Sequence, residues 1–71
     1  MPSNIQAIIF KDDAFTTNEA REWLNRNGYH PIKRVHNTAN YHRFRLQNPK
    51  KFKRFRLKDM GGGIKFVLGF S

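Results

Sequence analysis

In the second half of the chain, apolar and polar residues alternate with a period of two. This pattern is typical of β-strands that bury one face, because successive side chains of a strand point to opposite sides. Three stretches show it: 41–47, 53–58 and 64–70. This half of the chain is therefore predicted to form a sheet.

The alternation also predicts which side chains share a face of that sheet. Apolar residues are predicted to face a core, and the residues between them to face away from it. The inward set is Phe44, Leu46, Phe55, Leu57, Ile64, Phe66, Leu68 and Phe70. The outward set is Tyr41, Arg43, Arg45, Arg54, Arg56, Lys58, Lys65 and Val67.

Glycine and asparagine residues mark the turns. Residues 61–63 are three glycines followed by an alternating stretch, which predicts a β-hairpin. Residues 37–40 are predicted to form a turn after a short strand at 33–36. A helix over 49–60 is the alternative for part of this region, since Phe52 and Phe55 are three residues apart, but the hairpin pattern favours a strand.

A short break is predicted between the first two of these stretches. Asn48-Pro49 ends the strand pattern and is typical of the start of one helical turn, here through Phe52.

The first half of the chain predicts one strand and one helix. Residues 5–10 are apolar and β-branched, as in a strand. Thr16 followed by Glu19 is a capping box, and Gly28 suits the left-handed position just after a helix. The side chains predicted to be buried on this helix are Ala20, Trp23 and Leu24.

Together these elements predict an α+β fold in the order β-α-β-β-β. One helix is expected to pack on one face of a small, mainly antiparallel sheet of about four strands. Residues 1–71 are predicted to form a single domain, near the lower size limit for folding on one hydrophobic core. Because the chain has no cysteine, stability is expected to come from apolar burial.

The charge of the chain is concentrated in its second half. Residues 1–32 hold three Lys/Arg and four Asp/Glu, a net charge of −1, whereas residues 33–71 hold eleven Lys/Arg and one acid, a net charge of +10. Such a one-sided field is typical of a surface that binds a polyanion. It predicts a small, non-enzymatic protein that binds nucleic acid with low sequence specificity, and leaves open DNA or RNA, single or double strand.

The candidate binding residues are the outward cations of the strands with one aromatic among them, expected on the sheet face opposite the helix. They are Tyr41, Arg43, Arg45, Lys53, Arg54, Arg56, Lys58 and Lys65. Guanidinium groups suit phosphate contact, and Tyr41 can stack on an unpaired base. With few exposed rings, this face is expected to contact the nucleic-acid backbone more than to read sequence.

Two other interpretations stay open. The face can be merely solvated, because exposed sheet faces are polar and Lys/Arg protect sheet edges. Alternatively, the chain is a structural or protein-interaction module whose basic face docks an acidic protein. In that case the last strand, with Val67 exposed, would suit strand addition if it is a free edge.

Catalysis is not predicted, and neither is a metal or a cofactor. The three histidines, His30, His36 and His42, have no cysteine and few acids to complete a metal site. Asp12-Asp13 is a candidate pair of Mg²⁺ ligands, but its position is better explained as the end of a strand before the helix cap. A hydrolytic triad would need Ser3 or Ser71, both at the ends of the chain.

Several segments resemble a small β-α-β-β-β module of bacteriophages and large DNA viruses, found alone or appended to capsid-maturation and other virion-related proteins. The matching segments are 5–10, 16–24, Gly28-Tyr29, 41–45, 48–52 and 63–69. The resemblance implies a viral protein and a fold, but no catalytic residues. With no long apolar run or signal-like start, the chain is expected in the host cell cytoplasm or the virion, not secreted and not in a membrane.

Overall fold

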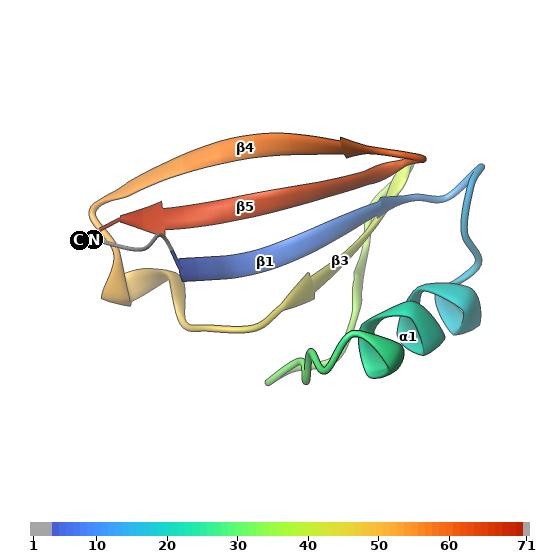
Figure 1. Cartoon of the computed structure of the whole chain (residues 1–71), viewed down its shortest axis with the longest axis horizontal. Coiled ribbons are helices and arrows are strands. Elements are labelled where there is room, and N and C mark those ends of the chain that lie inside the picture. The colour runs from blue at the N-terminus through green and yellow to red at the C-terminus, as the bar shows by residue number, and fades with distance from the viewer. Residues whose placement is uncertain (1–3, 71) are drawn as a thin grey trace.

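The computed structural model describes residues 4–70. It contains a helix, α1 (Thr17–Arg26), and a five-stranded antiparallel sheet in the order β2-β3-β1-β5-β4 (Figure 1). The strands are β1 (Asn4–Lys11), β2 (His36–Asn37), β3 (Tyr41–Arg45), β4 (Arg54–Gly61) and β5 (Ile64–Phe70). A 3-10 turn, η1 (Pro49–Lys51), joins β3 to β4.

The α+β class is confirmed, with five strands in place of about four. The strand predicted at 33–36 is the two-residue β2, shifted toward the turn. Residues 54–61 form a strand, so the alternative helix over 49–60 is wrong. The predicted helical turn after Asn48 is confirmed as η1, and the Asn48 side chain caps it by accepting from the Lys50 N–H at 3.0 Å.

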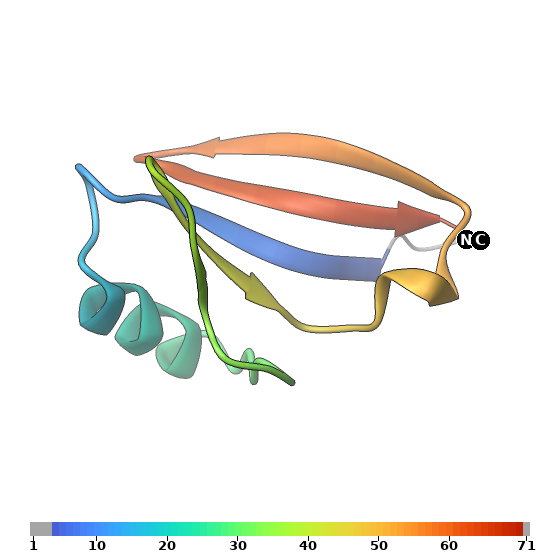
Figure 2. The same ribbon diagram turned by 180° about the vertical axis from the view of Figure 1, so that it is seen from behind.

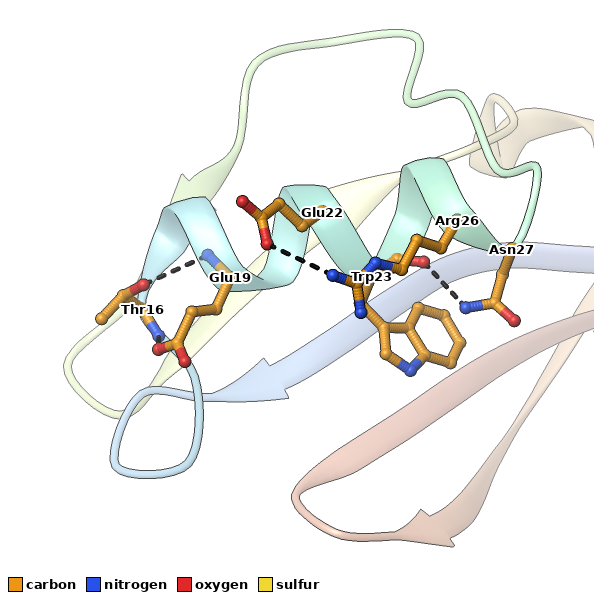
Figure 3. A network of polar contacts seen from close by, with 6 residues as sticks. All are labelled: Thr16, Glu19, Glu22, Trp23, Arg26 and Asn27. Atoms are coloured by element: carbon orange, nitrogen blue, oxygen red, sulfur yellow. Dashed lines mark hydrogen bonds and ion pairs between the residues drawn. The ribbon is translucent and has the colours of Figure 1, made fainter.

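The predicted capping box at the start of α1 is confirmed (Figure 3). The Thr16 hydroxyl accepts from the Glu19 N–H at 3.1 Å, and the Glu19 carboxylate accepts from the Thr16 N–H at 2.9 Å. At the other end, Gly28 has φ +77°, the left-handed conformation that glycine adopts without strain. At that end, too, the Asn27 side chain donates to the Trp23 carbonyl at 2.8 Å.

The core lies between α1 and one side of the sheet (Figure 2). Phe10 of β1 is at its centre, with the rings of Phe15, Trp23 and Phe44 edge-on at 5.1, 5.6 and 5.6 Å between centroids. Trp23 also meets the ring of Phe66 at 6.2 Å. The inward orientation predicted for Phe44 and Phe66 is therefore confirmed, and we call their side of the sheet the helix side.

The orientation predicted for β4 is wrong. Directly opposed residues of neighbouring antiparallel strands share a face, and Lys58 lies opposite Phe66, which is on the helix side. By the same pairing, Arg54 and Arg56 project to the helix side. Phe55 and Leu57 project to the other side, where they are 45% and 67% exposed. The cations of β3 and β4 therefore do not share a face.

The cause is an irregularity beside the hairpin turn. Gly61 lies opposite Ile64, but the next pair is Asp59 with Lys65, so Met60 is an extra residue on β4. Uninterrupted pairing from Gly61 would set Leu57 opposite Leu68, on the helix side, as the sequence pattern suggested. Because strand side chains alternate, one extra residue transfers every side chain of β4 that precedes it to the opposite face.

The edges of the sheet also differ from the prediction for the last strand. β5 lies between β1 and β4, and Val67 is only 5% exposed, so β5 is not a free edge. The edges are β2 and β4, and β4 is the one remote from α1 in Figure 1. No helix in the described part of the chain is long and apolar enough to cross a membrane.

Candidate nucleic-acid interface

We call the side of the sheet that faces away from α1 the open face. Register places on it alternate residues of the four longer strands. From β3 to β4 these are Tyr41, Arg43 and Arg45; Ala7, Ile9 and Lys11; Lys65, Val67 and Gly69; and Phe55, Leu57 and Asp59. The face thus combines cationic groups with exposed apolar and aromatic side chains.

Four of the eight predicted binding residues lie together on this face: Tyr41, Arg43, Arg45 and Lys65. The other four do not. Arg54, Arg56 and Lys58 project to the helix side of β4, beyond the area that α1 covers. Lys53 comes just before β4, outside the paired register, and lines a hollow with Arg54, Arg56 and Phe70. The single basic sheet face is therefore wrong, and the cations form two separate groups.

Lys65 and Tyr41 contact each other across the open face. The Lys65 Nζ atom lies 5.7 Å from the centre of the Tyr41 ring, within cation–π distance. Lys65 comes from β5 and Tyr41 from β3, so the lysine side chain spans β1 between them. This contact holds a positive charge beside an aromatic ring. A nucleotide can use both groups, because its phosphate pairs with the cation and its base stacks on the ring.

Arg43 is anchored at the centre of the face. Its terminal Nη2 donates to the side-chain carbonyl of Gln6 at 3.4 Å, and Gln6 itself is fully buried. The Gln6 amide is fixed in turn by donating to the Gln47 carbonyl at 2.9 Å. Arg43 lines both adjoining hollows of the open face, one with Phe55 and the other with Tyr41. Its guanidinium is therefore held in place between the two rings.

The sequence pattern missed Phe55 and Leu57 as surface residues. Phe55 lies against the Phe52 ring, with 6.1 Å between centroids and 74° between planes, so one edge is supported while nearly half of the side chain is exposed. The Met60 irregularity is the feature that places both residues on the open face, and nothing in the alternation itself reveals it.

Acidic side chains lie mostly away from the open face. Asp59 is the acid on it among the described residues, and its carboxylate accepts from the Gly61 N–H at 2.8 Å. The others follow β1 or belong to α1, where Glu22 and Arg26 make an ion pair at 3.9 Å. The molecule therefore has an acidic helix end and a basic, partly apolar sheet.

The histidines and acids do not assemble into a site. In residues 4–70, no three His, Cys, Asp or Glu side chains gather as a metal-binding group. His42 lies opposite Asn37, not His36, and its ring nitrogens meet the Asn37 side-chain oxygen at 2.7 Å and the Phe15 carbonyl at 2.9 Å. His42 thus links β3 to the segment before α1. Ser3 and Ser71 lie outside the described residues.

Comparison with known proteins does not assign a family. No family, curated protein or solved structure matches the chain. The resemblance to virion-related modules therefore stays a prediction.

Proposed function

We propose that this protein binds single-stranded nucleic acid through the open face, with low sequence specificity. The observation that carries the proposal is the exposed Phe55 ring on the same face as Tyr41, Arg43, Arg45 and Lys65. Exposed rings and cations on one sheet face suit an unpaired strand, because bases stack on the rings while the cations pair with phosphates.

The exposed ring favours a single strand over a duplex. In a duplex the base faces are stacked on one another, so Phe55 and Leu57 would meet only the charged backbone. Strand spacing places Tyr41 and Phe55 at opposite corners of the face, roughly 25 Å apart. That diagonal accommodates a few unstacked nucleotides, with Arg43 between the two rings.

Electrostatics supplies a modest part of the affinity in this arrangement. Three cations of the open face, Arg43, Arg45 and Lys65, are placed to contact phosphates. For a single strand, three such contacts correspond to a slope of about −2 in log K against log salt. The cations on the helix side of β4 add to the long-range field that attracts the polyanion.

The matched test compares two double variants that remove the same charge. Arg45→Ala with Lys65→Ala changes the open face, whereas Arg21→Ala with Arg26→Ala changes exposed positions on α1. Fluorescence anisotropy with a labelled single-stranded oligonucleotide should show a loss of about tenfold or more for the first pair and a much smaller loss for the second. Equal losses would mean that only the net charge matters and would contradict the proposal.

A second comparison isolates stacking. Phe55→Ala should weaken binding by about 1 kcal/mol or more, because ring–base stacking is worth ~1–3 kcal/mol per base. Ile32→Ala removes another exposed apolar side chain, one in the loop between α1 and β2, and should leave the affinity unchanged. A duplex that binds wild type as tightly as the single strand, with no effect of Phe55→Ala, would overturn the stacking argument.

The setting proposed for this activity is a viral one, in the host cell cytoplasm or the virion. It rests on the family resemblance alone. Docking of an acidic protein remains the second candidate function, and the exposed edge of β4 favours it.

A further inference from the structure

β4 is a long, open edge of the sheet. Seven of its eight residues pair with β5 on one side, and all eight are exposed. The other side of the strand presents backbone N–H and C=O groups outward, which is a template for another extended chain. The opposite edge, β2, has only two residues, so among the described residues β4 is the edge long enough for such pairing.

The side chains of β4 differ between its two sides. Arg54, Arg56 and Lys58 project to the helix side, and Phe55 and Leu57 project to the open face. A strand added to this edge would have its own side chains directly beside them. Carboxylates would complement the three cations on one side, and apolar groups would cover the two apolar side chains on the other.

We propose that β4 binds an extended acidic peptide by strand addition, one in which acidic and apolar residues alternate. Backbone hydrogen bonds would supply much of the affinity, and the two rows of side chains the specificity. This site shares Phe55 and Leu57 with the one proposed for nucleic acid, but its cations differ, because Arg56 projects to the helix side and Arg45 and Lys65 to the open face.

A second copy of this chain is a poor occupant of the edge. Pairing of one β4 with another would set Arg54, Arg56 and Lys58 beside the same cations of the partner on the helix side. Like charges directly opposite each other destabilise strand pairing.

The edge is nevertheless open to a chain of other composition. It is incompletely protected against pairing, because β4 has no proline and its open-face side chains before Asp59 are apolar.

The test uses a synthetic peptide of alternating glutamate and valine, as long as β4, with NMR titration of the whole protein. We expect shifts centred on residues 54–61 and new protection of their outward amides from hydrogen exchange. The same peptide with alternate backbone nitrogens methylated keeps its charge but loses the hydrogen bonds, so it should not bind. A peptide of the same composition with its glutamates grouped together should bind at least tenfold more weakly.

Charge reversal locates the contact. Arg56→Glu should weaken binding of the alternating peptide by about tenfold or more, whereas Arg21→Glu makes the same change of charge on α1 and should have little effect. The Arg45→Ala, Lys65→Ala variant should bind the peptide as wild type does, which separates the cations of this site from those of the open face. Equal binding of the methylated peptide, or β4-mediated dimers in sedimentation, would overturn the proposal. So would Arg56→Glu abolishing oligonucleotide binding while sparing the peptide.

Discussion

Gly69 is in β5 at the point where the Phe52 ring crosses the open face. A Cβ added at Gly69 would contact the ring Cγ and lie 2.6 and 2.7 Å from its Cδ2 and Cδ1 atoms, closer than carbon atoms can approach. Gly69→Ala must therefore displace the ring, which is half-buried and lies beside Phe55. Overpacking of this kind costs about 1–3 kcal/mol.

A smaller effect opposes that cost. Alanine restricts the unfolded chain more than glycine does, which stabilises the fold by about 0.4–1 kcal/mol where the native backbone suits alanine. The backbone at Gly69 is an ordinary strand conformation without positive φ, so this gain applies. We therefore expect a net loss of about 1–2 kcal/mol, and a melting temperature lower by roughly 5–15 °C for a domain of this size.

Thermal and urea unfolding, followed by circular dichroism, would measure the loss, and a double-mutant cycle identifies its cause. In a Phe52→Ala background the ring is gone, so Gly69→Ala should be neutral or slightly stabilising. If Gly69→Ala costs the same with and without the ring, the contact with Phe52 does not explain the effect. If it costs nothing in the wild type, the close approach itself is wrong.

Two further predictions concern the helix cap and the hairpin. The hydrogen bonds from the Thr16 backbone and side chain lower the pKa of Glu19 below its ordinary value of 4.5, so the carboxylate's contribution to stability is complete above that value and is lost as the pH falls through the lowered pKa. Glu19→Gln keeps an acceptor at this position, so the difference in melting temperature between pH 7 and pH 3 should shrink in this variant, and an unchanged difference would contradict the assignment. Deleting Met60 removes the extra residue, so β4 and β5 should pair without interruption in the observed register, and nuclear Overhauser effects should still place Leu57 opposite Val67. A shift of Leu57 to a position opposite Leu68 would show that another feature sets the register.

The helix was predictable because its signals are local. Thr16, Glu19 and Gly28 act through their own backbone and that of residues a few positions away, so their spacing suffices to define the start and end of α1. The strands after Tyr41 were predictable for the same reason, since alternation is a local pattern. Their existence and their approximate bounds are confirmed.

The composition of the faces was not predictable from alternation. Alternation shows that Arg54, Arg56 and Lys58 share a face, but only the pairing with β5 decides which one. That pairing depends on whether Met60 pairs with β5 or is left as an extra residue beside the turn of three glycines. The four candidate residues on β3 and β5 therefore lie on the predicted face, and the three on β4 do not.

The size of the helix explains why either register leaves β4 exposed. An α-helix with its side chains is about 10 Å across, whereas five strands span about 19 Å between the outer strand axes. The single helix α1 contacts β1, β3 and β5 through Phe10, Phe44 and Phe66, and no second helix covers β4 in the described part of the chain. The apolar residues of β4 would thus meet solvent on whichever side they project.

The irregularity at Met60 therefore does not decide whether Phe55 and Leu57 are exposed, but which cations they accompany. In the observed register they join Arg43 and Lys65 on the open face, and Arg54, Arg56 and Lys58 are left on the other side of the edge. In the alternative register, the cations of β3, β4 and β5 would share one face, and Phe55 and Leu57 would lie on the other. Stacking of a base on Phe55 beside Arg43 and Lys65 needs the observed arrangement, whereas either register leaves β4 with cations on one side and apolar groups on the other.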